Sequence, residues 1–146
     1  QDSVLLLVGT GSEEEKIRGK VSMLGLSEKV IFAGRRTDVE KIMSAADAFV
    51  LPSHFEGLPL VLVEAQSSGL NCFVSDAVPE EAKLLDNLEF IPLDIGADAW
   101  ADRVVSAALN PNRALASAVV AAAGYDCKLT AARIEEIYSQ QIALCL

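Results

Sequence analysis

The stretch AFVLPSHFEGLPLVLVEAQSSG, residues 48–69, decides the fold. Its first four residues are apolar without alternation, which is typical of a strand buried on both faces of a parallel sheet. A loop with two prolines and a glycine follows, and residues 59–68 then form an apolar run of helical length that ends at Gly69. Strand, loop and helix in this order make one βα unit, so the stretch predicts an α/β domain.

The same alternation repeats along the whole chain. Short apolar runs predict five strands, at residues 4–8, 30–32, 48–51, 72–75 and 89–93. Helical patterns occupy residues 13–24, 39–45, 59–68, 80–85, 97–109, 113–123 and 129–144, with Gly124 and Tyr125 separating the last two. Ser12 with Glu15 predicts a capping box, and Gly25 predicts a helix end. We therefore expect a doubly wound, parallel, Rossmann-like α/β fold with C-terminal helices.

Composition limits the classes of function. With 146 residues the chain fits one domain, so residues 1–146 are predicted to form a single unit. A formal net charge of −9 argues against wide contact with nucleic acid or an anionic membrane. The three cysteines lie far apart and lack metal-ligand spacing, which fits a reduced, cytoplasmic setting, and no apolar run approaches the ~20 residues of a membrane helix.

Ligands of doubly wound sheets bind at the carboxyl ends of the strands, which makes two loops candidates. Residues 9–15 begin like a dinucleotide fingerprint. The third glycine is missing, however, and three carboxylates in the first helical turn would repel a pyrophosphate. We interpret this loop as a tight turn before a capped helix.

The second loop, residues 52–59, is the better anion cradle. The N–H groups of Leu60 and Val61 open a helix and have no intrahelical partner. Gly57 allows a ligand to approach the backbone closely, and no acid occupies the first turn.

Glu64 interrupts the apolar run of this helix, about 7 Å along the axis from its start at 1.5 Å per residue. That distance suits a ribose whose diphosphate sits at the helix N-terminus, and an acid is a common partner of a ribose diol. On residue type alone, a solvent-facing stripe or a pair with Arg35 or Arg36 is equally consistent. Glu56 and His54, taken singly, fit a solvated loop acid and a packing or hydrogen-bonding histidine.

Glu56 to Ala65 resembles the Glu-x7-Glu motif of the family 4 (group 1) retaining glycosyltransferases, whose two Rossmann-like domains form the GT-B arrangement. Residues 5–11, 30–35, 45–53 and 67–70 also resemble family segments, in the family's order and at its distances. The resemblance implies the donor-binding domain of an enzyme that transfers a sugar from a nucleoside diphosphate. Residues 75–81 are similar to a subgroup from surface-polysaccharide synthesis.

The resemblance also implies roles for single residues. Glu56 would be the catalytic residue facing the donor sugar, and Glu64 would hold the ribose. The donor-binding positions are Gly57, Leu58, Leu60, Val61, Glu64, Phe32, Gly34, Arg35 and His54. Within this set, the loop from Phe32 to Arg35 would flank the nucleobase. Family members need neither metal nor other cofactor, and this sequence has no Asp-x-Asp.

The family sheet runs 3-2-1-4-5-6, and its first βα unit, with a basic Arg and Lys pair, is not found here, nor is the acceptor-binding N-terminal domain. We therefore expect a domain truncated at its N-terminus, five strands in the order 2-1-3-4-5, and no transfer by this chain alone. The alternative for the sheet is a gap at the place of its first strand, which would leave two unpaired edges. In the full-length enzyme, a sugar or lipid-linked acceptor would bind through the N-terminal domain, at the inner face of the membrane.

Two alternatives remain from the sequence. The chain could be a stand-alone, non-catalytic nucleotide-binding module. It could also belong to a sugar-nucleotide epimerase, since these enzymes share the GT-B architecture, although they generally lack the Glu-Gly-x-Pro helix start of residues 56–59.

Overall fold

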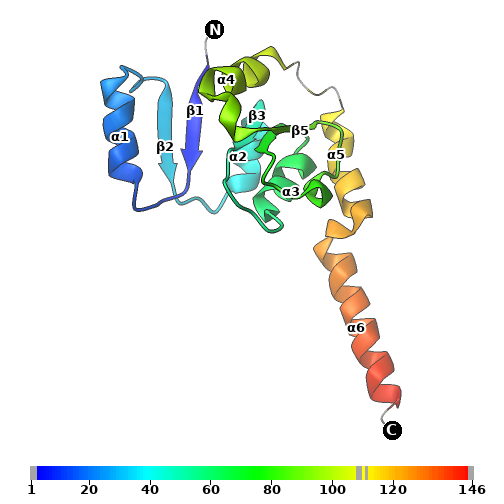
Figure 1. Ribbon diagram of the computed structural model, residues 1–146. Helices are drawn as coiled ribbons and strands as arrows, with labels where there is room; N and C mark the ends of the chain where they lie inside the picture. The colour runs from blue at the N-terminus through cyan, green and yellow to red at the C-terminus, as the bar shows by residue number, and fades with distance from the viewer. Residues whose placement is uncertain (1–2, 108–109, 111, 145–146) are drawn as a thin grey trace. The chain divides into compact units, whose positions relative to one another are not determined.

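The computed structural model describes residues 3–107, 110 and 112–144 (Figure 1). The chain divides into two compact units, residues 1–39 and 40–146. We call them the N-terminal unit and the C-terminal unit. Each has its own parallel sheet. Whether both act as one domain, as the chain length predicts, stays a prediction.

The N-terminal unit is a single βαβ element. Strand β1 (Leu5–Val8) leads through helix α1 (Glu14–Met23) to strand β2 (Val30–Gly34). The two strands pair in parallel, with Leu5 opposite Val30. No residue in the described part of this unit is buried, although all four side chains of β1 are apolar.

Helix α1 ends as predicted but begins differently. Gly25 has φ +68° and its N–H donates to the Ser22 carbonyl at 3.0 Å, which is the expected helix end. The predicted capping box is wrong, because the helix begins at Glu14 with Glu13 as its N-cap and no side chain caps it. Ser12 lies one residue too far from the helix to reach its free N–H groups.

The C-terminal unit carries three strands with helices around them. It comprises α2 (Val39–Ala45), β3 (Ala48–Leu51), α3 (Leu60–Ser67), β4 (Asn71–Ser75), the short 3₁₀ helix η1 (Glu80–Ala82), β5 (Leu88–Ile91), the 3₁₀ helix η2 (Leu93–Ile95), α4 (Ala97–Ser106), α5 (Arg113–Val120), the π-helical turn η3 (Ala121–Tyr125) and α6 (Cys127–Leu144). Its sheet is parallel and has the order β3-β4-β5.

The core of this unit lies on both faces of β4, where four successive residues, Cys72 to Ser75, are buried. On one face Trp100 of α4 packs with Phe73 and Ile91, and its indole N–H donates to the Pro92 carbonyl at 3.0 Å. Cys72 and Val74 point to the opposite face, which α3 covers. A strand covered on both faces confirms the predicted α/β class.

Arg113 joins three helices of this unit. Its guanidinium donates to carbonyl oxygens at the ends of α2 and α3, those of Met43, Ser44, Ala46 and Ser68. Gly69, with φ +70°, makes this approach possible, because a Cβ at Gly69 would lie 2.6 Å from the Arg113 Cα. The predicted helix end at Gly69 is therefore confirmed, and it also allows α5 to pack closely.

The predicted strand order is only partly correct. The pairs β1-β2, β3-β4 and β4-β5 form and are all parallel, but the strands make two sheets instead of one of order 2-1-3-4-5. The predicted β1-β3 pair is therefore wrong, because no hydrogen-bonded ladder joins these two strands in the described part of the chain.

The remaining elements follow the sequence closely. Gly124 lies within η3 with φ +100°, and this kink separates α5 from α6, as predicted. Residues 80–85 form only a 3₁₀ turn at Glu80–Ala82 instead of a helix. The predicted helix 97–109 is observed at Ala97–Ser106, while residues 108 and 109, and Cys145, lie outside the described residues.

Candidate functional site

The loop of residues 52–59 follows β3 and leads directly into α3. Pro52 has no N–H, so it ends the hydrogen-bond ladder of β3. At the other end of the loop, buried Pro59 is the N-cap of α3 with φ −74° and ψ 101°. The two prolines therefore fix where the strand stops and where the helix starts.

Glu56 is half-buried in this loop and is held by a serine. The Ser53 hydroxyl donates to Glu56 Oε1 at 2.7 Å. Ser53 itself is held by the buried Ser75, whose hydroxyl donates to the Ser53 carbonyl at 2.5 Å. Neither serine is predicted from the sequence. The only signal is that each serine lies at or just beyond the carboxyl end of a strand, where site residues of such sheets gather.

Gly57 is not required by the fold. Its φ lies outside the left-handed region, and a Cβ built on it meets no atom within 4 Å. Neither backbone strain nor packing inside the described chain therefore explains a glycine here. Close approach of a ligand to the backbone, as predicted, is compatible with this open space.

The N-terminus of α3 is exposed and uncharged. Leu60 and Val61 occupy its first turn, where an α-helix leaves N–H groups without an intrahelical acceptor. The Leu62 N–H already donates to the Pro59 carbonyl at 2.9 Å. The side chains of Leu58, Leu60 and Val61 are all exposed, and no acid lies in the first turn. This helix start can accept an anion without charge repulsion.

Glu64 lies one turn further along α3 with an exposed side chain, and it has no ion pair with any described residue. Arg36 donates two hydrogen bonds to Asp38, at 2.8 and 2.7 Å. These hydrogen bonds lower the pKa of the Asp38 carboxyl below its usual value. Arg35 and Arg36 belong to the other unit, so the alternative pair of Glu64 with one of them stays a prediction. Solvent exposure and a ligand contact both remain consistent with the position of Glu64.

The residues predicted to flank a nucleobase belong to the N-terminal unit. Phe32 is half-buried in β2, and the Arg18 guanidinium lies 4.0 Å from its ring centroid, so one face of the ring is covered. Gly34 ends β2 with φ +62°, and its carbonyl accepts the Gly9 N–H at 2.8 Å. Arg35 is exposed. Phe32, Gly34 and Arg35 thus lie in the N-terminal unit. The other predicted site residues share one segment of the C-terminal unit: Glu56, Gly57, Leu58, Leu60, Val61 and Glu64.

His54 is exposed in the same loop as Glu56 and makes no hydrogen bond within the described residues. Its packing role is therefore not seen here, and its donor-binding role stays a prediction.

Gln66 fixes the segment that follows β4. Its side chain is fully buried on the same helix as Glu64. The amide group donates to the Ala82 carbonyl at 2.8 Å, and its oxygen accepts the N–H groups of Leu84 and Leu85 at 2.8 and 3.1 Å. The sequence offers one signal for this residue: Gln66 is four residues after Leu62, which places a polar group on the inward face of an apolar helix.

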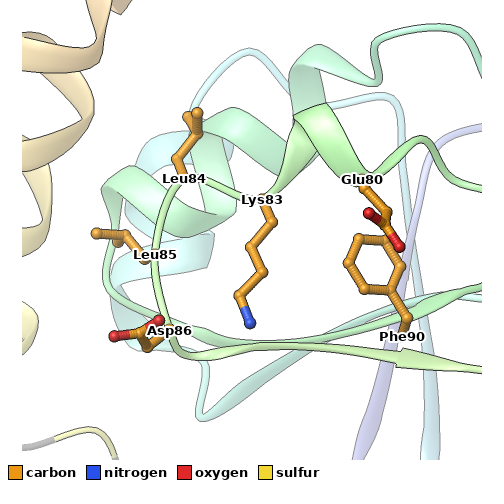
Figure 2. A pocket seen from close by; sticks show the side chains of 6 residues that line it. All are labelled: Glu80, Lys83, Leu84, Leu85, Asp86 and Phe90. Carbon is orange, nitrogen blue, oxygen red and sulfur yellow. The ribbon is translucent and has the colours of Figure 1, made fainter.

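A shallow pocket of about 450 Å³ lies on the segment that Gln66 holds. Glu80, Lys83, Leu84, Leu85, Asp86 and Phe90 line it, and Figure 2 shows the Lys83 side chain extending into it. None of the predicted site residues borders this pocket, so it is separate from the Glu56 loop.

Metal and thiol chemistry gain no support from the described part of the chain. Burial raises the pKa of the Cys72 thiol to about 12, which keeps it protonated and unreactive. No three His, Cys, Asp or Glu side chains gather as metal ligands within the described residues, and metal independence stays a prediction. None of the described helices has the length and apolar character needed to cross a membrane.

Known proteins similar to this chain identify its family. A family model described as "Glycosyl transferases group 1" matches residues 1–121. The protein named "Putative glycosyltransferase EpsF" of Bacillus subtilis (strain 168) is 33% identical over 138 residues, covering 92% of this chain and 36% of that protein. The UDP-Gal:alpha-D-GlcNAc-diphosphoundecaprenol alpha-1,3-galactosyltransferase of Escherichia coli is 41% identical over 76 residues, covering 51% of this chain and 20% of that protein.

Among solved structures, the apo form of the lipopolysaccharide outer core galactosyltransferase WaaB is similar with a TM-score of 0.69 and 26% identity. The match covers 94% of this chain and 41% of that chain. The chain thus spans well under half the length of these relatives. The Rossmann-like fold, the Glu56 to Glu64 segment and the family match agree, and the chain belongs to the group 1 glycosyl transferases.

Proposed function

We propose that this chain is the donor-binding part of a retaining glycosyltransferase that moves a sugar from a nucleoside diphosphate to a hydroxyl acceptor in polysaccharide or glycoconjugate synthesis. One observation carries the proposal. Two carboxylates, Glu56 and Glu64, flank an uncharged helix start at α3, and a glycine that the fold does not require lies between them. That arrangement offers an oxygen ligand for a sugar, N–H donors for a diphosphate and a second oxygen ligand for a ribose.

The spacing along α3 supports this division of roles. Leu60 opens the helix and Glu64 follows four residues later, about 6 Å along the axis. A diphosphate at the N–H groups of Leu60 and Val61 would thus leave the attached ribose within reach of Glu64. The donor sugar, on the other side of the diphosphate, would face Glu56. The loop from Phe32 to Arg35 is proposed to flank the base.

The protein contributes positioning and electrostatic stabilisation of the leaving group. The chain carries −9 formal charges, so the helix start must supply local attraction for the diphosphate. We expect further cationic groups, and the acceptor site, from parts of the enzyme outside this chain. For that reason the chain alone should transfer no sugar and bind nucleoside diphosphates weakly.

Uridine diphosphate sugars are the first donors to test, because the E. coli relative is named for a UDP-galactose donor. The setting we propose is the cytoplasm, with the enzyme at the inner face of the membrane and no metal requirement. A sugar or lipid-linked acceptor fits the names of the relatives.

The test uses the intact protein and a panel of UDP-, GDP- and ADP-sugars, with hydrolysis and transfer followed by nucleotide release and by NMR of the product anomer. The wild type should turn over one donor class with retention, in the presence of a metal chelator. Glu56→Gln should lower kcat about 100-fold while affinity for the bare nucleotide changes little. Glu81→Gln, an exposed carboxylate on η1, is the matched control and should behave as wild type.

Two results would overturn the proposal. Nucleotide binding without turnover of any donor would favour the stand-alone binding module. Interconversion of the sugar nucleotide, without transfer, would favour the epimerase alternative.

A further inference from the structure

The start of the Glu56 loop is tied to the central strand of the sheet. The β3-β4 ladder runs from Ala48 opposite Asn71 to Leu51 opposite Val74. It stops there because Pro52 has no N–H to donate. Beyond the ladder, the fully buried Ser75 donates its hydroxyl to the Ser53 carbonyl at 2.5 Å. A side-chain hydroxyl therefore continues the connection where the backbone pairing ends.

Ser53 in turn holds the Glu56 carboxylate by a hydrogen bond. Its hydroxyl donates to Glu56 Oε1 at 2.7 Å, across three residues of the loop. Fixing a glutamate side chain in one position costs conformational entropy. The Ser53 hydrogen bond holds the Glu56 side chain before a ligand binds, so less of this cost falls on binding. The hydroxyl holds Oε1, and within the described part of the chain Oε2 has no hydrogen bond, so it is open to a ligand.

We infer that Ser53 is a positioning residue for Glu56, and that Ser75 supports it by fixing the Ser53 backbone. This inference rests on the proposed function, in which Glu56 faces the donor sugar. Ser53 would act only through Glu56 and would not itself contact the sugar. Two hydroxyls thus connect the buried strand β4 to the carboxylate at the reacting end of the donor.

The experiment measures donor turnover by the intact enzyme. Ser53→Ala should lower kcat about 10- to 100-fold, the scale expected when a catalytic group is displaced. KM for the sugar nucleotide and affinity for bare UDP should change by no more than about twofold, because the diphosphate and ribose contacts remain. Ser53→Thr keeps the hydroxyl and should restore most of the lost turnover. Ser44→Ala, which removes an exposed hydroxyl bonded to the Glu40 carbonyl, is the control.

A double-mutant cycle separates positioning from a general structural effect. In the Glu56→Gln background, Ser53→Ala should reduce turnover further by less than about twofold, because residues acting as one unit are not additive. Ser75→Ala should also lower kcat and should add little to Ser53→Ala. Melting temperatures are measured for every variant. If Ser53→Ala melts early, Ser53→Cys replaces it, since its volume is close to that of serine and its donor is weak.

The outcomes distinguish the two proposals. If Glu56→Gln lowers turnover and Ser53→Ala does not, the positioning inference is overturned and the proposed function stands. Equal losses from Ser53→Ala in both backgrounds would likewise overturn it, because the effect would not pass through Glu56. If Glu56→Gln leaves turnover intact, the proposed role of Glu56 fails, and the positioning inference fails with it.

Discussion

Replacing Gln66 with Met should loosen the segment between β4 and β5. Methionine has a similar length and volume but cannot donate or accept the bonds that Gln66 makes. The change would leave three main-chain groups without their partners: the Ala82 carbonyl and the N–H groups of Leu84 and Leu85. An unpaired buried polar group costs about 1–3 kcal/mol. Leu84 and Leu85 are only half-buried, so water can partly replace the lost bonds to their N–H groups. We therefore expect the free energy of local opening to fall by about 3 kcal/mol, the low end of the sum for three unpaired groups.

Hydrogen exchange in the intact protein measures this loss locally. A fall of about 3 kcal/mol in the opening free energy corresponds to exchange about 100-fold faster. Peptides covering residues 76–87 should show this acceleration, while those covering residues 113–120 should change little. Gln140→Met, at an exposed position on α6, is the control and should leave exchange unchanged. Unchanged protection of the Leu84 and Leu85 amides in Gln66→Met would refute the argument that Gln66 holds this segment.

Four further predictions concern two glycines, the thiols and the isolated chain. Gly69→Ala should lower the free energy of unfolding by at least about 2 kcal/mol, because Ala is strained at this φ and its Cβ would meet Arg113. Chemical unfolding measures this loss, and a value under about 0.5 kcal/mol would contradict the prediction. Gly57→Ala should leave unfolding unchanged yet weaken UDP binding in calorimetry on the intact enzyme, and equal affinity would remove the close-approach argument. Burial raises the pKa of Cys72 to about 12, so iodoacetamide at pH 8 should label the exposed Cys127 and spare Cys72 until denaturant is added. Peptide mass mapping assigns each label, and labelling of Cys72 in the native protein would be the contrary result. Residues 1–146 alone should show no transfer with any sugar nucleotide, and measurable turnover would mean that they form a complete catalytic module.

Much of the fold could be predicted because its signals are local. Unalternating apolar runs located all five strands within two residues at either end, and Gly25, Gly69 and Gly124 marked helix ends that the structure confirms by positive φ. The β1-β3 pair could not be predicted correctly, since strand order depends on which segments meet in space and not on the pattern within any one of them. The predicted capping box of Ser12 and Glu15 is wrong because the helix begins one residue later than expected, with Glu13 in place of Ser12 as the N-cap.

The candidate site was predictable only in part. The Glu56 to Glu64 segment carries a family motif and follows a buried strand, so its residues could be named from the sequence. Ser75 and Gln66 could not be, because their partners are main-chain groups up to 22 residues away along the chain. Ser53 could not be either, since a loop serine three residues before a glutamate carries no signal that its hydroxyl holds the carboxylate. Serine and glutamine are ordinary surface residues by type, and only burial shows that their hydrogen bonds are structural.

The ribose assignment of Glu64 tests the account most directly. Calorimetry on the intact enzyme compares UDP with its 2′-deoxy and 3′-deoxy analogues, in the wild type, in Glu64→Gln and in the matched helical control Glu135→Gln. We predict that Glu64→Gln weakens UDP binding by about 1–3 kcal/mol and abolishes the preference for UDP over at least one deoxy analogue, while Glu135→Gln retains both. Equal UDP affinity in the wild type and Glu64→Gln, with the preference for the ribose hydroxyls retained, would contradict the donor-binding role of this helix.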